Sequence, residues 1–506
     1  MQSPLHNVGG WISRRAATTG GRLAVIDGEI RLTYAELEAR CARAAGWLRA
    51  QGVGPGDRVA LLLANRSAYL ELVFAAARIG AIAVPINTRL AAPEIAQILE
   101  DCTPRVLCHE EELGERLAAS RVPDETQCAS ATKFEAEAER ATPLTEIRAV
   151  SPDDPMILMY TSGTTGVPKG ALLPHRKTLF NSRNAQLFFE LTGDDRVLTV
   201  VPLFHSFGLA ILAIPALFAG ACVVLERHFD PQRVWEAVDE HSLTIVGGVP
   251  TMFRALLETL DATPKLRARP NTLRFLFTAG AAIPVETIRG FEQHGLLLKQ
   301  GFGQTETSIL CCLDSEDALR KAGSVGRPVF HAELRIVHEA GLDGPVSAWQ
   351  DCAAGETGEI VVRGPITMLG YWNRPEATAE TLREEGWLRT GDLGSADSEG
   401  FVTLTGRARE MYISGGENVY PAQIEATYHE HPDVLDVAVV GVAHERWGET
   451  GRAYLVWAPS TPLDPEALRK WGRERLASFK VPGEFVEVDE LPRTASGKIQ
   501  KHLLPG

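Results

Sequence analysis

The sequence lacks the features of several protein classes, and these absences narrow its function before any motif is considered. No run of Lys and Arg is dense enough to contact duplex nucleic acid, and the formal net charge of the 506 residues is −14, so we expect no nucleic-acid partner. The eight cysteines include no CxxC pair, and only Cys311 and Cys312 are adjacent, which predicts reduced thiols in a cytoplasmic protein. The amino-terminal residues lack the apolar core of a signal peptide, in agreement with that location.

One uncharged stretch, residues 207–225, is close to the length that spans a membrane. Pro215 and the Ala-Gly-Ala sequence at 219–221 interrupt it, and the β-branched letters CVVLE that follow are typical of a strand. We therefore expect a buried helix, a turn and a buried strand, and no integral membrane segment. The chain also has no internal repeat and no long low-complexity segment.

Apolar segments alternate with helical patterns through the first hundred residues. Thr33 and Glu36 form a capping box at the start of a helix, and Gly52 follows its end. Further helices are expected at about 67–79 and 93–101, and buried strands at 57–64, 81–86 and 105–109. Strands that alternate with helices indicate a parallel sheet covered on both faces. Residues 110–150 are polar and irregular, so we expect an excursion before the core resumes.

The alternation returns after the excursion and gives way to a β-rich stretch with many Gly turns at about 325–405. After 406–410 a compact unit follows, with one helix expected at about 421–431 and another from Pro465. The expected fold class is α/β: a large N-terminal domain of parallel-type sheets covered by helices plus a β-rich subdomain, followed by a small α+β C-terminal domain.

Six patches rich in Gly, Thr or charged residues lie between the apolar segments of the sequence. They are YTSGTTGVPKG (160–170), PLFHSFG (202–208), GFGQTET (301–307), GWLRTGD (386–392), GRAREMYISGGENVYP (406–421) and PRTASGKIQK (492–501). The first combines Gly residues that permit close approach of a ligand with hydroxyl donors and the positive Lys169, so it suits a phosphate group. It is not a Walker A loop, because Val167 and Pro168 separate Gly166 from the lysine. A flexible Ser/Gly surface loop is the alternative.

This set of patches, in this order and at these spacings, resembles the adenylate-forming superfamily of acyl-CoA synthetases, firefly luciferase and nonribosomal adenylation domains. The similarity spans about residues 30–503. It implies an AMP-binding domain with the acyl pocket at 1–405, a hinge at 406–409 and a mobile C-terminal lid at 410–506. The implied enzyme is an AMP-forming acid–thiol ligase that uses ATP, Mg²⁺ and CoA.

The resemblance also implies which residues hold the nucleotide. The loop residues that cradle the β- and γ-phosphates are Thr161, Ser162, Gly163, Thr164, Thr165, Gly166 and Lys169. In the GFGQTET patch, Gly301, Phe302 and Gly303 line the nucleotide, Thr305 contacts the α-phosphate and Glu306 anchors Mg²⁺. Phe302 stands where the family often has Tyr, which keeps a ring for stacking on adenine and loses a hydroxyl. A solvated carboxylate is the alternative for Glu306.

Two further positions complete the implied catalytic set. Asp392 is implied to accept both ribose hydroxyls and Arg407 to reach the ribose as well, whereas a turn-forming Asp is the alternative for Asp392. Lys498 bridges the substrate carboxylate and the α-phosphate in the adenylating position of the lid, although a lysine so near a chain end is usually a solvated charge.

The resemblance also covers the lid's second position. After the lid rotates, Gly415 and Gly416 are implied to line the pantetheine tunnel. The hinge departs from the family pattern, since Gly406 replaces a common Asp and Arg409 stands where Asp or Lys is common. Rotation needs permissive backbone torsions more than a particular charge, so we expect the hinge to work nonetheless.

The acyl pocket is expected behind the gate histidine, His205, for which a satisfied core histidine is the alternative. Its expected lining is His205, Ser206, Phe207, Val249, Gly280, Ala281 and Ile309. No carboxylate lies between Leu198 and Leu225, so an ammonium group would have no partner there and an α-amino acid is disfavoured.

The sequence therefore predicts an apolar acid. The NTRLAAPEI stretch at 87–95 resembles bacterial fatty-acyl-CoA ligases and favours a medium-to-long-chain fatty acid, while Phe207 keeps an aryl or cinnamic acid as the alternative. CoA is the expected acceptor, with a carrier protein or another nucleophile as alternatives. A non-enzymatic nucleotide-binding relative is disfavoured because the charged catalytic groups are all present. The sequence also allows a homodimer.

Overall fold

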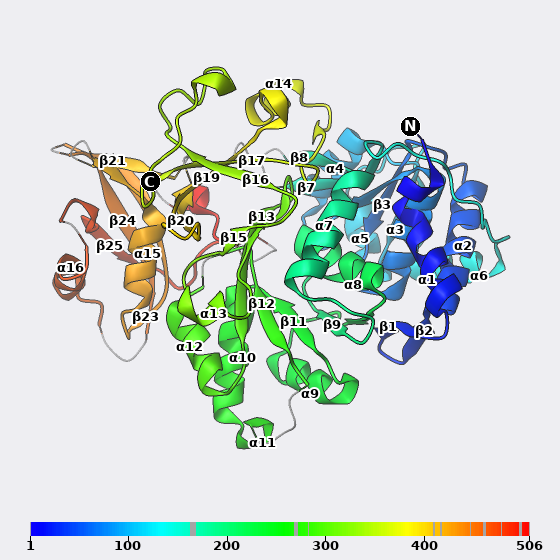
Figure 1. Ribbon diagram of the computed structural model, residues 1–506, viewed down its shortest axis with the longest axis horizontal. Helices are drawn as coiled ribbons and strands as arrows, with labels where there is room; N and C mark the ends of the chain where they lie inside the picture. Colours follow the sequence, from blue (N-terminus) through cyan, green and yellow to red (C-terminus); the bar gives the residue numbers. More distant parts are fainter. Residues whose placement is uncertain are drawn as a thin grey trace.

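Four β-sheets organise the chain (Figure 1). The computed structural model describes residues 2–161, 168–267, 272–281, 283–407, 410–414, 417–445, 447–458, 462–476, 478–494 and 498–504. Two large sheets with their helices contain most of the chain up to Pro328, and a short strand at 370–371 also joins one of them. The strands of a four-stranded sheet lie between Glu333 and Arg407. The fourth sheet belongs to the C-terminal unit, which is coloured orange to red in Figure 1.

The seven-stranded sheet has the order β18-β8-β7-β4-β3-β5-β6. Its strands are β3 (Arg58–Leu62), β4 (Ile82–Pro85), β5 (Val106–His109), β6 (Gln127–Ser130), β7 (Pro155–Thr161), β8 (Lys169–Pro174) and β18 (Gly370–Tyr371). The strands from β7 to β6 are parallel, and β8 and β18 are added antiparallel at one edge. The helices of this region are α1 (Trp11–Thr19), α2 (Tyr34–Ala50), α3 (Ser67–Ile79), α4 (Ala92–Cys102), α5 (Gly114–Ala118), α6 (Ala131–Arg140) and α7 (His175–Phe188).

The nine-stranded sheet has the order β15-β14-β13-β12-β11-β9-β10-β1-β2 and is parallel from β13 to β1. Its strands are β1 (Leu23–Asp27), β2 (Ile30–Thr33), β9 (Arg196–Thr199), β10 (Cys222–Leu225), β11 (Ile245–Gly248), β12 (Phe275–Thr278), β13 (Leu298–Gln304), β14 (Ser308–Cys312) and β15 (Arg327–Pro328). Its helices are α8 (Ile214–Ala219), α9 (Pro231–His241), α10 (Pro250–Ala262), α11 (Pro264–Arg267), α12 (Val285–Gln293) and α13 (Asp317–Arg320). In Figure 1, α9, α10 and α12 gather together below β11 and β12.

Two smaller sheets complete the fold, one antiparallel and one mixed, in which β25 pairs parallel with β24. The four-stranded sheet consists of β16 (Glu333–Val337), β17 (Gly358–Arg363), β19 (Leu388–Ala396) and β20 (Val402–Arg407), with α14 (Pro375–Thr381) nearby in sequence. The C-terminal unit contains β21 (Tyr412–Ser414), β22 (Glu417–Val419), β23 (Val434–His444), β24 (Gly448–Trp457), β25 (Glu484–Glu487), α15 (Pro421–His429) and α16 (Pro465–Arg473). A separate apolar cluster, which includes Ile424, Tyr428 and Leu455, gives this unit its own core.

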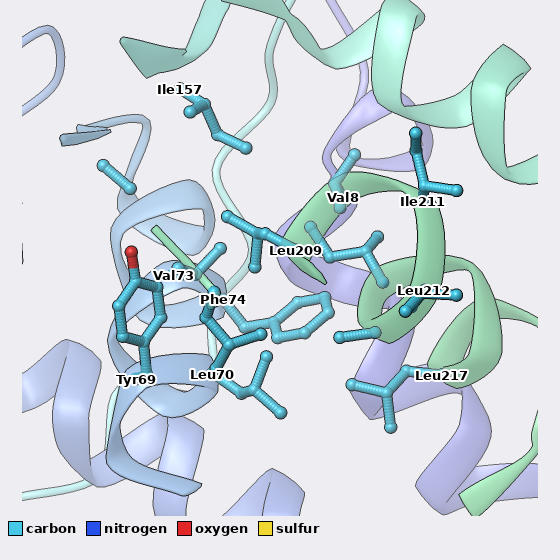
Figure 2. Packing of buried hydrophobic residues seen from close by; sticks show 14 of the residues in the cluster. Val8, Tyr69, Leu70, Val73, Phe74, Ile157, Leu209, Ile211, Leu212 and Leu217 are labelled. Carbon is cyan, nitrogen blue, oxygen red and sulfur yellow. The ribbon is translucent and has the colours of Figure 1, made fainter. Parts of the chain in front are cut away.

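The largest apolar core joins the two large sheets (Figure 2). Helix α3 contributes Leu70 and Phe74, and the π-helical segment η4 (Phe207–Ala213) and α8 contribute Leu212 and Leu217. Each of these four side chains is at most 1% exposed. Full burial of one such side chain stabilises the fold by about 1.5–3 kcal/mol. The core therefore fixes η4, which carries part of the expected acyl pocket, against the rest of the domain.

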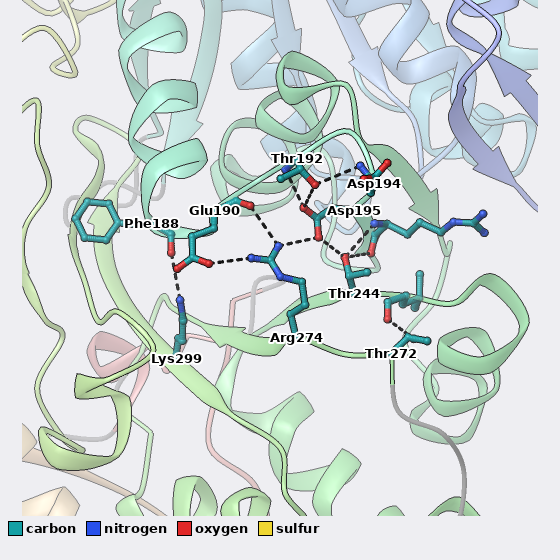
Figure 3. Close-up of polar contacts among 11 residues, drawn as sticks. Phe188, Glu190, Thr192, Asp194, Asp195, Thr244, Thr272, Arg274 and Lys299 are labelled. Atoms are coloured by element: carbon teal, nitrogen blue, oxygen red, sulfur yellow. Dashed lines mark hydrogen bonds and ion pairs between the residues drawn. The ribbon is translucent and has the colours of Figure 1, made fainter. Parts of the chain in front are cut away.

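A polar network ties together the segments that enter the central parallel strands (Figure 3). Asp195, just before β9, accepts hydrogen bonds from Thr244 Oγ1 at 2.7 Å and Arg274 Nη1 at 2.8 Å, and these two residues directly precede β11 and β12. Lys299, near the start of β13, donates from Nζ to the Phe188 carbonyl at 3.2 Å. The opposite, carboxyl ends of such strands are where ligands bind in open α/β sheets.

The structure confirms several expected elements and corrects one expectation. The uncharged stretch forms η4, α8 and β10 in succession, and none of the described helices has both the length and the apolar composition to cross a bilayer. The expected irregular excursion at 110–150 is wrong, because it contains β6 and α6. Strand β6 was not apparent in the sequence because it is a polar edge strand with two of its four residues exposed.

Candidate active site

Two strands that pair antiparallel flank the expected phosphate loop. Strands β7 and β8 pair antiparallel, with Thr161 opposite Lys169, and Thr161 Oγ1 donates to the Lys169 carbonyl at 3.3 Å. The expected phosphate ligands Ser162, Gly163, Thr164, Thr165 and Gly166 lie outside the described residues. The Lys169 ammonium lies 5.4 Å from the centre of the Tyr371 ring, which places a cation at the base of the loop.

The Tyr371 side chain connects this loop to the expected metal anchor. Its hydroxyl donates to Glu306 Oε1 at 2.9 Å, and the Glu306 carbonyl accepts from Met368 N at 2.8 Å. Glu306 is partly buried, so its carboxylate is held in one orientation and remains accessible to a ligand. One carboxylate beside a phosphate-binding loop fits Mg²⁺, which prefers a few protein and phosphate oxygens with water completing the shell.

Two glycines in β13 are required by close packing. A Cβ on Gly301 would lie 2.5 Å from the Phe277 ring, and one on Gly303 would lie 1.9 Å from the Ser308 carbonyl oxygen. Phe302 between them is only 8% exposed and belongs to the large core, so it presents little more than an edge outward. The strand thus delivers Thr305 and Glu306 at its carboxyl end with a tightly fixed backbone. Stacking of Phe302 on adenine stays a prediction.

Asp392 is buried in β19, and its carboxylate has two polar partners, Arg407 and Gln304. Arg407, its paired residue on β20, places Nε 3.1 Å from Asp392 Oδ1. Gln304 donates Nε2 hydrogen bonds to Asp392 Oδ2 and, at 2.8 Å, to the Thr390 carbonyl. Gln304 therefore links β13 to β19 and orients the carboxylate that we expect to hold the ribose.

The charge environment of Asp392 has opposing contributions. Burial raises its pKa above the ordinary value, and Glu306 adds to that rise. Arg407, the hydrogen bond from Gln304 and the nearby Lys498 act in the opposite direction. A buried carboxylate with bonds already made to its charged form is ready to accept hydroxyl donors without reorganising.

Lys498 reaches this group of charges from the C-terminal unit. Its backbone is fixed by hydrogen bonds with Thr494, from Lys498 N to Oγ1 at 3.1 Å and from Thr494 N to the Lys498 carbonyl at 2.7 Å. The residue retains solvent exposure, yet protein surrounds its ammonium group, and this burial lowers its pKa. Arg407 lowers the pKa further, while Asp392 and Glu306 oppose the shift. The structure thus brings together Lys498, Asp392, Glu306 and Arg407, as expected from the sequence.

His205 lies within electrostatic range of the same lysine. Burial, followed by repulsion from Lys498, lowers its pKa to about 4, so the imidazole is neutral at pH 7. Its Nδ1 accepts from Phe207 N at 3.2 Å, which fixes the ring at the start of η4. A neutral imidazole at this position does not compete with Lys498 for a carboxylate.

Aromatic and small side chains form the wall beside His205. The Phe207 and Phe277 rings pack edge to face with their centres 5.8 Å apart. Gly280 has φ +91°. A Cβ added to Gly280 would lie 4.0 Å from Val249 Cγ1, so these two expected pocket residues are neighbours. The remaining expected lining residues differ in exposure: Ser206 and Ile309 are buried, whereas Ala281 is exposed.

Three residues near the site were not identified from the sequence. Gln304 and Tyr371 are described above; Gln304 lies inside the GFGQTET patch, whereas no motif marks Tyr371. Lys177, on α7, is 2% exposed and donates to Ser308 Oγ. Its position could not be predicted from the sequence, since a lysine on a helix is ordinarily solvent-exposed.

Three other expected residues, Arg409, Gly415 and Gly416, lie outside the described residues.

Comparisons with known proteins agree with this geometry. The family model described as "AMP-binding enzyme" matches residues 12–372, and the model of the C-terminal domain of the same enzymes matches residues 423–498. Over 502 residues the chain is 41% identical to feruloyl-CoA synthase of an Amycolatopsis species, covering 98% of this chain and 97% of that protein. It is also 41% identical to indoleacetate–CoA ligase of Aromatoleum aromaticum, covering 97% and 96%.

A solved structure adds information about the position of the C-terminal unit. ATP-bound MatB from Rhodopseudomonas palustris superposes with a TM-score of 0.90 at 29% identity, over 99% of this chain and 98% of that one. The same protein without ligand gives a TM-score of 0.81. The arrangement of the units here is therefore closer to the ATP-bound form. By its two matching domain models and its full-length relatives, the chain belongs to the AMP-binding enzymes of the adenylate-forming superfamily.

Proposed function

We propose that this enzyme joins an aryl-substituted carboxylic acid to CoA in two steps. In the first, a carboxylate oxygen attacks the α-phosphorus of ATP, and pyrophosphate leaves to give an acyl adenylate. In the second, the CoA thiolate attacks the acyl carbon, AMP leaves, and a thioester remains. Activation is necessary because a free carboxylate is a poor electrophile, whereas AMP is a good leaving group.

The chain's own residues account for the charge problem of the first step. The carboxylate and the α-phosphate are both anions, so their approach requires cations placed before they meet. Lys498 supplies one from the C-terminal unit and Lys169 another from the phosphate loop, while Asp392 and Arg407 hold the ribose. Bound Mg²⁺, with Glu306 as its protein ligand, would neutralise phosphate charge.

The observation that carries the choice of acid is the full-length identity of 41% to two enzymes whose names specify acids with an aromatic ring. The surroundings of His205 are compatible with an apolar acid, because Phe207 and Phe277 pack edge to face there and are 4% and 0% exposed. The absence of a carboxylate between Leu198 and Leu225 argues against an amino acid. The first expectation from the sequence, a fatty acid, has less support than the aryl alternative.

A thioester assay that depends on ATP, Mg²⁺ and CoA tests this proposal across acid classes. Ferulate and indole-3-acetate serve as the aryl acids, with fatty acids, a dicarboxylate and an α-amino acid as comparisons. We expect kcat/KM for an aryl acid to exceed that for a fatty acid by about tenfold or more. A preference for a fatty acid of any length would overturn the choice of substrate and leave the two-step reaction standing.

The acceptor, the domain motion and the cell context form part of the same proposal. We infer that residues 406–409 act as the hinge and that Gly415 and Gly416 meet the pantetheine arm after rotation. Replacing CoA in the assay by a phosphopantetheinylated carrier protein tests the acceptor, and free CoA should give the higher rate.

A cytoplasmic location suits the eight cysteines, all of which are free. Light scattering would decide between a monomer and a homodimer.

A further inference from the structure

Three potential metal ligands meet on the four-stranded sheet, at the connection between β16 and β17. His338 directly follows β16, while Cys352 and Glu356 lie in the loop that leads into β17. Their ligand atoms all lie within 4.8 Å of one another. None of the three residues belongs to the motifs that build the adenylating site, so the cluster has no role in the reaction proposed above.

The distances within this cluster match those around a tetrahedral metal ion. The Cys352 Sγ lies 3.5 Å from His338 Nδ1. With a Zn–S distance of about 2.3 Å and a Zn–N distance of about 2.0–2.1 Å, two ligands at a tetrahedral angle are about 3.5 Å apart. Glu356 Oε2 lies 3.7 Å from Nε2, the other ring nitrogen of His338. One ligand atom from each of the three residues lies within 4.8 Å of the others, so modest side-chain rotations bring all three to one ion.

The backbone around the cluster is held before any ion binds. His338 N donates to the Gln350 carbonyl at 3.0 Å, and Cys352 N donates to the Ile336 carbonyl at 2.9 Å. Ala353 N donates to Glu356 Oε2 at 2.8 Å, which closes the turn between the last two ligands. Preorganised ligands of this kind lose little conformational entropy when a metal binds.

The packing and charge at the cluster also favour a cation. A Cβ added to Gly358 would lie 2.6 Å from Cys352 Sγ, so the thiol rests directly against the backbone of β17. The carboxylates of Glu356 and Asp351 lie near this thiol and supply negative charge for a cation. A bound divalent ion would take Cys352 as the thiolate, and its proton would pass to solvent.

We propose that His338, Cys352 and Glu356 bind one Zn²⁺ ion at a structural or regulatory site separate from the Mg²⁺ of the reaction. Thiolate, imidazole and carboxylate together select a borderline-soft metal, whereas Mg²⁺ takes oxygen ligands almost exclusively. Three protein ligands leave a fourth tetrahedral position for water. The ion would fasten the 350–356 loop to β16.

Titration of the metal-stripped full-length enzyme with Co²⁺ as a spectroscopic substitute for Zn²⁺ tests this site. We expect one equivalent of Co²⁺ to produce a thiolate-to-cobalt charge-transfer band, and added Zn²⁺ to displace it. Cys352→Ser should abolish the band. Cys128→Ser, a substitution at the exposed cysteine of β6, is the matched control and should leave the band unchanged.

Glu356→Gln provides a second variant that should keep the fold, because Glu356 is exposed and the glutamine carbonyl still accepts from Ala353 N. It should weaken the binding of Zn²⁺, measured by equilibrium dialysis, by about tenfold or more. Excess Mg²⁺ is present throughout, so the adenylating site does not contribute. Absence of the band in the unmodified enzyme, or a band that persists in Cys352→Ser, would overturn the proposal. Unchanged affinity in Glu356→Gln would do the same for the three-ligand site.

Discussion

Lys498 is placed where two carboxylates and an arginine act on its charge at once. Burial and Arg407 disfavour the protonated amine, whereas Asp392 and Glu306 favour it. The net effect is a pKa below the ordinary value. An ammonium in this balance is stabilised most when additional negative charge arrives. The approaching carboxylate and α-phosphate supply that charge, so Lys498 is suited to stabilise the transition state rather than the resting enzyme.

Substitution of Lys498 should separate the two half-reactions. Lys498→Ala should lower ATP–pyrophosphate exchange by about 10²- to 10³-fold, because a cation opposite developing charge is lost. Thioester formation from a synthetic acyl adenylate should remain close to that of the unmodified enzyme. Lys470→Ala, at an exposed position of α16, is the control. Equal losses in both half-reactions would show that Lys498 does not have this role.

Glu306 can be tested without disturbing its neighbour Tyr371. In Glu306→Gln the side-chain carbonyl still accepts the tyrosine hydrogen bond, while the negative charge is removed. The adenylation rate should fall by about 10²-fold or more, and the Mg²⁺ concentration needed for half-maximal rate should rise. Glu286→Gln on α12 is exposed and serves as the control. Normal turnover and normal Mg²⁺ dependence in Glu306→Gln would place the metal elsewhere.

The contact between α7 and β14 includes one buried titratable group, the amine of Lys177. Lys177 near the start of α7 donates to Ser308 at the start of β14, and Ser308 has φ +61°, which is unfavourable for a residue with a side chain. Burial lowers the Lys177 pKa to about 7, with Glu306 opposing and Arg176 assisting the shift. The folded protein therefore favours the neutral amine, whereas the unfolded chain binds a proton up to its ordinary pKa of about 10.4.

The pH dependence of stability follows from this difference. Between pH about 7 and pH about 10 the unfolded state binds more protons at Lys177, so stability should rise with pH through that window. Lys177→Met should remove this contribution, and the urea midpoint measured at pH about 7 and about 9 should then change less. The unpaired Ser308 hydroxyl in the variant affects both pH values equally. Lys470→Met is the control, and parallel pH profiles of Lys177→Met and the unmodified enzyme would contradict the prediction.

Elements with strong local patterns could be predicted from the sequence. The capping box of Thr33 and Glu36 forms as expected at the start of α2, and the expected helix at 67–79 is α3. Strand β6 could not be predicted, because its pairing with β5 rather than its composition makes it a strand. The burial of Lys177 could not be predicted from the sequence either, because it depends on Ser308, which lies 131 positions away in the chain.

At the scale of the whole molecule, the sequence predicted which protein residues should bind the nucleotide. The structure supplied the arrangement of those residues in space. The motifs identify Asp392, Glu306 and Lys498, which are distant in sequence and meet only after folding. No motif revealed which of two positions the C-terminal unit adopts. Its likeness to ATP-bound MatB and the approach of Lys498 to Asp392 support the proposal that this is the adenylating position. On that proposal, the contacts that hold the C-terminal unit must break before the second step.

One such contact is the hydrogen bond from Arg254 Nη1, on α10, to the Leu435 carbonyl on β23, at 2.8 Å. The Arg254 side chain is 52% exposed, so the bond should contribute at most about 1 kcal/mol to the adenylating position. Arg254→Ala should therefore lower pyrophosphate exchange by up to about fivefold, while thioester formation from preformed adenylate stays equal or becomes faster.

The direction of these two rates distinguishes a latch from a general loss of stability. Arg289→Ala on α12 also removes an exposed arginine from the large domain and should leave both rates unchanged. If Arg254→Ala slowed both half-reactions together, the bond would only stabilise the fold. Opposite changes would mean that the enzyme divides its time between two lid positions, and that a single surface hydrogen bond biases the division because neither position is strongly favoured.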